Sequence, residues 1–289
     1  MNARMSILLG SALMLAVGCR TGSPTHPAAA RALEARSQEN LNAVLWMQTS
    51  AEYRESARQA YRIAAMQLDA ALRDPAWTAA VEQPRNDSTL PPAVVLDLDE
   101  TVLDNSAYEA RLVREGRAYS EDDWNRWCEE RKAGAVPGAI EFLTYAHDRG
   151  VTPIYISNRE HSVEQATREV MVRLGAPIES ASDTVLTRHE NGWESSDKGP
   201  RRQFAAGRYR ILLLIGDNLE DFVSIPADAK SIAGRDALAR SYDARWATNW
   251  IMLPNPMYGS WEQAITAGVA PADDAGALRR KFDALRVDR

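Results

Sequence analysis

A short apolar stretch that ends in two closely spaced aspartates constrains the fold of this chain more than any other feature. Residues 94–96 read Val-Val-Leu and lead directly into Asp97 and Asp99. An apolar run of this kind is typical of a buried strand in a parallel sheet. Open α/β sheets bind their ligands outside the carboxyl ends of their strands. We therefore expect a parallel sheet in which Asp97 and Asp99 lie at the edge that carries the chemistry.

Strand and helix patterns alternate through the rest of the chain. The strands are expected at 93–98, 151–156, 184–187, 210–215 and 250–253. The main helices are expected at 31–73, 139–149, 162–174, 201–206 and 275–286. This alternation predicts an α/β fold with a doubly wound, mainly parallel sheet in one domain, 31–289. The N-terminal helical segment 31–74 and the polar insertion 105–136 are expected to form a small helical cap over the site.

The first residues have the pattern of an export signal. A short positive start at 2–4 precedes the apolar segment 5–17, which is too short to span a membrane. The following Gly18-Cys19 completes a pattern that resembles a bacterial lipobox, which predicts a signal peptide at 1–18, lipidation of Cys19 and a tether at 19–30. The alternative is an ordinary signal peptide that is cleaved nearby. Arg20 after the cysteine favours an outer-membrane lipoprotein of the bacterial cell envelope, on its periplasmic or surface face, with the lipid as the membrane contact.

The charge and the cysteine content of the chain limit the classes of partner and of covalent cross-link that we expect. The formal net charge is -6, and we find no basic stripe with interleaved aromatic residues, so nucleic acid is not an expected partner. The chain has 2 cysteines, and if Cys19 carries lipid then Cys128 has no partner for an internal disulfide. We expect Cys128 to be a buried, small apolar residue rather than a catalytic thiol.

Polar side chains follow several of the predicted strands. Ser157 follows the second strand, Asp217 follows the fourth, and Lys198 stands just before a helix. In a parallel sheet these positions converge with Asp97 and Asp99 on one crevice. Three carboxylates there would repel one another unless a hard divalent cation such as Mg²⁺ lay between them. A lysine and a hydroxyl beside such a cation indicate that a phosphoryl group is the remaining ligand.

The order of these motifs resembles the haloacid-dehalogenase phosphatase superfamily. The strings Asp97–Ser106 and Gly216–Phe222 are similar to the class C acid phosphatases, the bacterial lipoprotein acid phosphatase/5'-nucleotidase family, and the resemblance runs from about 41 to 261. It implies a haloacid-dehalogenase-like fold and a Mg²⁺-dependent acid phosphatase. The expected substrates are nucleoside monophosphates and other small phosphomonoesters, which are hydrolysed through an aspartyl-phosphate. A homodimer is compatible with this assignment.

The resemblance also implies roles for single residues. Asp97 is the nucleophile and Asp99 the general acid and base. Asp97, the backbone carbonyl of Asp99 and Asp217 are the metal ligands. Ser157 and Lys198 hold the phosphoryl oxygens.

Three further residues are expected to support this centre. Asp221 orients either the waters of the metal or Lys198. Asn158 shapes the loop after Ser157, and the neighbouring Arg159 is either part of that loop or a surface ion pair. For Thr101 two roles stay open, which are a structural bond in the turn and contact with substrate.

Aromatic residues are expected at the leaving-group end of the site. By resemblance Trp124, Tyr258 and Trp261 correspond to side chains that sandwich a planar base. The alternative for these residues is packing in the core or in the lid.

Rival functions remain at this stage. Arg188-His189-Glu190 is similar to the Arg-His-Gly motif of histidine phosphatases, but Glu190 replaces the required glycine and the motif lies late in the chain. A lipoprotein that binds nucleotides without turnover is disfavoured because Asp97 and Asp99 are both present. Phosphoryl transfer to an alcohol instead of water would use the same residues.

Overall fold

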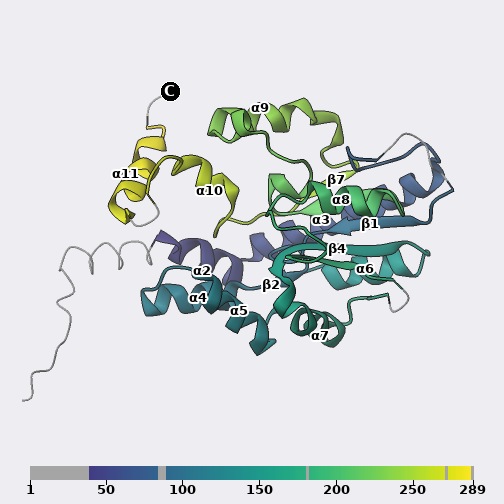
Figure 1. Cartoon of the computed structure of the whole chain (residues 1–289), viewed down its shortest axis with the longest axis horizontal. Coiled ribbons are helices and arrows are strands. Elements are labelled where there is room, and N and C mark those ends of the chain that lie inside the picture. Colours follow the sequence, from purple (N-terminus) through teal and green to yellow (C-terminus); the bar gives the residue numbers. More distant parts are fainter. Residues whose placement is uncertain (1–38, 84–88, 180–181, 271–272, 288–289) are drawn as a thin grey trace, which may run out of the picture.

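The computed structural model of this chain describes residues 39–83, 89–179, 182–270 and 273–287 (Figure 1). The predicted signal peptide, Cys19 and the tether lie outside these residues. Among the helices of the described part, none combines the length and apolarity that crossing a bilayer requires.

The centre of the fold is a sheet of five strands that all run parallel to their neighbours, in the order β5-β4-β1-β6-β7. The strands are β1 (Pro92–Leu96), β4 (Thr152–Glu160), β5 (Val185–Arg188), β6 (Arg210–Gly216) and β7 (Trp250–Met252). The chain builds outwards from β1 to one side of the sheet, then returns to build β6 and β7 on the other. Such a reversal opens a crevice at the carboxyl end of the central strand.

Both faces of this sheet are covered because the residues of β1 alternate between two cores. Val94 and Leu96 pack in one apolar core, whereas Ala93 and Val95 pack in the other. Figure 1 shows the helices of the two faces above and below the strands. The first core lies under α3 (Ala51–Arg73), α6 (Ala139–His147) and α7 (Glu164–Leu174), and the second under α8 (Gly199–Ala206) and α9 (Ile232–Ser241). The predicted doubly wound α/β fold is therefore confirmed.

The N-terminal helical segment divides between two layers. The expected continuous helix is wrong at Ser50, which separates α2 (Leu41–Thr49) from α3 and caps α3 by accepting a hydrogen bond from the Tyr53 amide at 3.0 Å. The apolar stripe of α3, which includes Ala64 and Leu68, is buried in the core beneath the sheet. In the structure α3 thus belongs to the sheet layer, whereas α2 contacts the insertion.

The insertion forms two helices closed by a short ladder. These are α4 (Ser106–Glu115) and α5 (Glu121–Glu130), with β2 (Leu103–Asp104) pairing antiparallel to β3 (Gly134–Ala135) at the base. The ladder was not expected, because two-residue strands leave no pattern in a sequence. Cys128 on α5 is buried, as predicted.

The C-terminal part lies above α2 in the view of Figure 1, at the end of the molecule away from the sheet. It contains α10 (Ser260–Ile265) and α11 (Asp274–Ala284). The ammonium of Lys281 on α11 pairs with Glu262 of α10 and with Glu39 of the N-terminal part, each at 2.5 Å. Four single turns of 3₁₀-helix complete the described elements, at His161–Val163, Leu219–Asp221, Ala227–Ala229 and Asp243–Arg245.

Candidate active site

The loop after β1 places the first two acids. The Asp97 amide donates to the Ile215 carbonyl on β6 at 2.9 Å, which continues the sheet register by one residue. The chain then reverses, since the Leu98 carbonyl accepts from the amides of Val102 and Leu103 at 2.8 Å each. Glu100 adopts a left-handed conformation with φ 60° inside this turn. Asp97 and Asp99 consequently stand on a tight, internally bonded loop at the carboxyl end of the central strand.

Three carboxylates meet in front of this loop. Oxygens of Asp97, Asp217 and Asp221 all lie within 4.8 Å of one another. The Lys198 ammonium contacts Asp97 and lies 2.7 Å from Asp221 Oδ1. The side chain of Asp99 is bound elsewhere, so the structure gathers Asp97, Asp217, Asp221 and Lys198 into one cluster and leaves Asp99 beside it.

The charges of this cluster are not balanced. Burial raises the pKa of Asp97 well above its usual value, Lys198 opposes this rise, and the neighbouring Asp221 and Asp217 add to it. Burial, followed by Asp221, raises the pKa of Asp217 to about 6. Burial lowers the pKa of Lys198, but Asp221 and Asp97 more than compensate and keep the ammonium charged. One ammonium among three carboxylates leaves an excess of negative charge, and an all-oxygen donor set of this kind fits a hard divalent cation.

A glycine allows Asp221 to approach β6. A Cβ atom on Gly216 would stand 2.3 Å from Asp221 Oδ2, so any side chain at this position would displace the carboxylate. Asp221 Oδ2 also accepts from the Asn218 amide at 2.8 Å, which closes the turn after the strand. The spacing Gly-Asp-Asn-x-x-Asp is therefore explained by the packing of Asp221 against the strand end.

Asp217 is held by two neutral donors. Thr101 Oγ1 donates to Asp217 Oδ1 at 3.1 Å, and Asn255 Nδ2 donates to Oδ2 at 2.9 Å. Thr101 is fully buried. Of the two roles left open for Thr101, this geometry favours the structural one, which is to orient Asp217.

Asp99 forms an ion pair that sequence reasoning did not assign. Arg159 NH2 and Nε lie 2.7 Å and 3.0 Å from Asp99 Oδ1, and Asn105 Nδ2 donates to the same oxygen at 2.9 Å. Arg159 is only 1% exposed, so it is not a surface residue. The strand β4 extends to Glu160 rather than ending at 156, so Ser157 and Arg159 are two residues apart in extended chain and point the same way. If the strand had been predicted to continue to residue 160, Ser157 and Arg159 would have been expected on the same side of it.

The loop around Ser157 is fixed from both sides. Ser157 Oγ accepts from the Arg159 amide at 3.1 Å and lies 3.4 Å from Asp99 Oδ2. The buried Arg201 donates to the Asn158 side-chain carbonyl and to the Ser157 backbone carbonyl, both at 2.5 Å. Arg201 thus fixes Ser157 and Asn158 at the end of β4, and sequence reasoning did not single it out.

All three predicted aromatic residues line the same cavity of about 1020 Å³ as Asp97 and Asp99. Trp124 packs edge-on against Tyr108 at 5.1 Å, and the Arg159 guanidinium stands 5.4 Å from the centre of its ring. Trp261 is 42% exposed and donates from Nε1 to the Tyr258 carbonyl at 3.2 Å. The Tyr258 hydroxyl donates to the buried Glu100.

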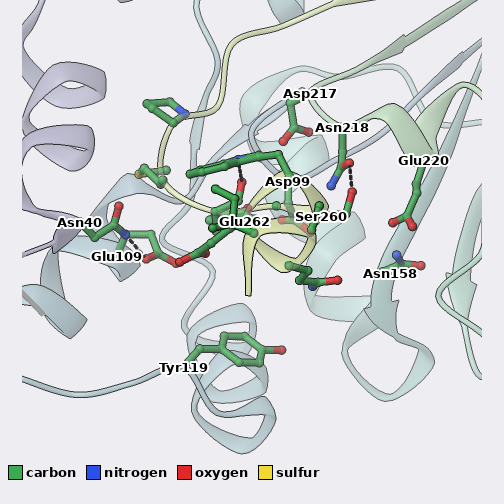
Figure 2. A pocket seen from close by; sticks show the side chains of 18 of the residues that line it. Asn40, Asp99, Glu109, Tyr119, Asn158, Asp217, Asn218, Glu220, Ser260 and Glu262 are labelled. Carbon is green, nitrogen blue, oxygen red and sulfur yellow. Dashed lines mark hydrogen bonds between the residues drawn. The ribbon is translucent and has the colours of Figure 1, made fainter. Parts of the chain in front are cut away.

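Two further pocket residues had not been singled out from sequence. Tyr119, just before α5, presents an exposed ring to the cavity and stands apart from the other side chains in Figure 2. Glu109 lies on α4, one turn beyond Asn105, and accepts a hydrogen bond from Asn40 at 2.9 Å (Figure 2). Contacts such as Asn40–Glu109 join positions far apart in the chain, so no local pattern announces them.

Replacing Glu109 by glutamine should stabilise the protein, and more so at high pH. Burial raises the pKa of Glu109 to about 7, with Asn40 opposing and Glu262 adding to the rise. Between the unfolded pKa of about 4.3 and this value the unfolded state binds fewer protons, so stability falls as pH rises. Urea unfolding of Glu109→Gln and wild type should therefore show a stability difference that grows by about 2 kcal/mol from about pH 5 to about pH 8.

Glu115→Gln is the matched control, because Glu115 lies on the same helix and pairs with Arg117 at the surface. Its stability difference from wild type should change little with pH. An equal difference at both pH values for Glu109→Gln would show that this carboxyl is not buried as described.

Comparison with known proteins gives the same assignment. Residues 10–261 match the family model described as HAD superfamily, subfamily IIIB (Acid phosphatase). The class C acid phosphatase from Bacillus anthracis is 34% identical, with a TM-score of 0.77 over 89% of this chain and 100% of that one. A class C acid phosphatase from Bacillus anthracis with tungstate bound matches at 33% identity and a TM-score of 0.73, over 88% of this chain and 99% of that one. The chain therefore belongs to subfamily IIIB of the haloacid-dehalogenase superfamily and is an acid phosphatase, a hydrolase of phosphomonoesters.

Proposed function

We propose that this protein is a Mg²⁺-dependent acid phosphatase that hydrolyses nucleoside monophosphates and other small phosphate esters through an aspartyl-phosphate. The observation that carries the proposal is the carboxyl group of Asp97 at the end of β1, in contact with Lys198 and within 4.8 Å of Asp217 and Asp221. A carboxylate so placed can attack phosphorus while its neighbours hold the phosphoryl oxygens. Asp97, Asp217 and the backbone carbonyl of Asp99 would hold the metal, which would offset charge on those oxygens.

The two acids take unlike roles because their surroundings differ. An oxygen of Asp97 forms a bond to phosphorus as the bond to the leaving oxygen breaks, and Asp99 gives that oxygen its proton. Asp99 then takes a proton from the water that attacks the aspartyl-phosphate, which releases inorganic phosphate and restores Asp97. Arg159 and Asn105 both bind Asp99 Oδ1, so they fix the orientation of this carboxyl group.

Ser157 and Lys198 are the proposed phosphate-binding residues. The Ser157 hydroxyl stands next to Asp99, and the Lys198 ammonium stands next to Asp97, so both can donate to one phosphoryl group between the acids. Asp221 holds Lys198 in place at 2.7 Å. The tungstate in the Bacillus anthracis relative supports binding of a tetrahedral oxyanion here.

The aromatic residues support a planar leaving group. Trp124, Tyr258, Trp261 and Tyr119 line the cavity that also contains Asp97. A base of a nucleoside monophosphate could stack on such rings, which is worth about 1–3 kcal/mol per base. Trp124 also contacts Arg159, so it supports the catalytic acid in addition to any base it binds.

Replacing Trp261 by alanine should separate nucleotide binding from chemistry. Trp261 touches the backbone of Tyr258 rather than a catalytic side chain. We expect KM for a nucleoside monophosphate to rise about 5- to 100-fold with little change in kcat, which corresponds to the loss of one stacking interaction. KM for a small alkyl phosphate should stay the same, and steady-state kinetics with both substrates measures this directly.

Trp261→Phe is the control, because it keeps an aromatic face and should keep most of the nucleotide affinity. Equal losses with both substrates would contradict stacking and leave the phosphatase assignment standing. Adding an alcohol acceptor to the same assay tests phosphoryl transfer, since hydrolysis yields inorganic phosphate and transfer yields a new phosphate ester.

The remaining organisation is also part of this proposal. A lipidated Cys19 and a tether at 19–30 would place the domain in the bacterial cell envelope, at the outer membrane. The insertion 105–136 with α2 would form a cap over the substrate. Two copies of the chain would be able to form a homodimer. The lipobox-like pattern that ends in Gly18-Cys19 supports this placement.

A further inference from the structure

A second cluster of ligand-type side chains lies at the β5 edge of the sheet, away from the cluster of catalytic acids. His161 begins the 3₁₀ turn after β4, and Glu164 is the first residue of α7. Thr187 belongs to β5, and Glu190 follows in the turn after that strand. Glu190 is the last residue of the Arg-His-Glu motif, which the phosphatase reaction does not use. The fold thus brings two separate segments, 161–164 and 187–190, together at one point.

The donor atoms of this cluster are closely spaced. One ligand atom from each of His161, Glu164 and Glu190 lies within 4.8 Å of the other two. His161 Nδ1 is 2.8 Å from Glu164 Oε2 and 3.3 Å from Thr187 Oγ1. Thr187 Oγ1 is 3.0 Å from Glu164 Oε2 and 3.2 Å from Glu190 Oε2. Ligands at about 2.0–2.2 Å from a tetrahedral zinc ion are about 3.3–3.5 Å apart, so these four atoms are close to the required spacing.

Among the described residues, the two carboxylates of this cluster are contacted by one guanidinium, that of Arg168, which Glu164 shares with Asp183. Glu164 Oε2 and Glu190 Oε2 both face the Thr187 hydroxyl, and Glu190 Oε2 also accepts from the Thr187 amide at 3.2 Å. Arg168 neutralises the Glu164 carboxylate from behind, through Oε1 at 2.6 Å, and leaves Oε2 directed into the cluster. Glu164 is only 12% exposed, so its carboxylate cannot turn freely into water. A cation between these atoms would satisfy both carboxylates together.

We propose that His161, Glu164 and Glu190, with the Thr187 hydroxyl, form a second metal site that takes a transition-metal cation such as Zn²⁺. Imidazole nitrogen favours zinc and its neighbours in the transition series over Mg²⁺. The site therefore differs in chemistry from the all-oxygen cluster of Asp97, Asp217 and Asp221. The metal ion would be bound by the neutral form of His161, through the lone pair on Nδ1.

Such an ion would link β4, α7 and β5. Residues 157–159, which carry the phosphate-binding and acid-orienting groups, end just before His161. The ion would act as a cross-link that holds the end of this strand against α7 and the turn after β5. Its expected effect is on stability rather than on the chemical step.

Titration of the purified, chelator-treated full chain with Zn²⁺ in excess Mg²⁺ tests this site. The Mg²⁺ occupies the oxygen-only cluster, so we expect one Zn²⁺ per chain by calorimetry and a rise in Tm on binding. His161→Gln and Glu190→Gln should each weaken Zn²⁺ binding at least about tenfold and abolish the rise in Tm. Both variants should keep the wild-type phosphatase activity in Mg²⁺, which shows that they are folded.

His147→Gln is the matched control, since His147 is an exposed histidine beside a carboxylate, 3.9 Å from Asp148. It should bind Zn²⁺ as the wild type does. Wild-type affinity in both His161→Gln and Glu190→Gln, or the absence of Zn²⁺ binding by the wild type in Mg²⁺, would overturn the proposal. Failure of phosphatase activity in every protein, with Zn²⁺ binding intact, would count against the proposed reaction and leave this site in place.

Discussion

Asp97→Asn should lose at least about 10⁴-fold in kcat with every phosphomonoester, because an amide cannot attack phosphorus as a carboxylate does. The variant keeps the size of the side chain, and its carbonyl oxygen can still accept the hydrogen bond from Lys198 that the structure shows. The loss should therefore appear in kcat rather than in folding. Steady-state assays with an aryl phosphate, together with a thermal melt, measure both.

Asp148→Asn is the control, because Asp148 is an exposed acid next to His147. It should retain wild-type turnover. Full turnover by Asp97→Asn would remove the proposed nucleophile and with it the aspartyl-phosphate.

Removing divalent cations should lower kcat about 10³-fold or more, and Mg²⁺ should restore it. Without the ion, the carboxylates of Asp97, Asp217 and Asp221 share one ammonium, and burial already raises the pKa of Asp97. A phosphoryl group, itself negative, would add to this repulsion. Asp217→Asn removes one proposed ligand and should raise the Mg²⁺ concentration for half activity at least about tenfold.

Glu220→Gln is the matched control for Asp217→Asn. Glu220 lies in the same 3₁₀ turn as Asp221 and lines the cavity, but it is not one of the three acids of the cluster. Its Mg²⁺ dependence should match that of the wild type. Activity that survives thorough chelation would show that these acids do not need a divalent cation for turnover.

The sequence predicts where the strands lie along the chain and that their polar ends meet better than it predicts side-chain contacts. Asp97 and Asp217 follow apolar runs, and parallel pairing brings such strand ends together, whereas Lys198 was placed only by its position just before a helix. The ion pair of Arg159 with Asp99 was not predicted because β4 continues through the polar residues 157–160, which have no apolar pattern typical of a strand. Beyond the apolar core, the end of a strand is set by its hydrogen bonds to the neighbouring strand, and amino-acid composition does not predict it.

Contacts between residues far apart in the chain were not predicted, for a different reason. The helix α3 has an apolar stripe that shows it is buried, but not whether it packs on the sheet or in a cap. The pairs Asn40–Glu109 and Tyr258–Glu100 join residues that are far apart in the chain. Each pair depends on how the cap and the loop after β7 pack against the strand ends. Local periodicity in the sequence does not encode this packing.

The most direct test of the central claim is to stop the reaction in acid during turnover and locate the phosphoryl group on the protein by mass spectrometry. Asp99→Asn with an aryl phosphate is the suitable background: a phenolate can leave without a proton from Asp99, whereas the second step lacks its base, so the intermediate should accumulate. We predict one phosphoryl group, labile to hydroxylamine, on the peptide that contains Asp97. A phosphoryl group on another residue, or none at any time while phosphate is being released, would contradict nucleophilic catalysis by Asp97.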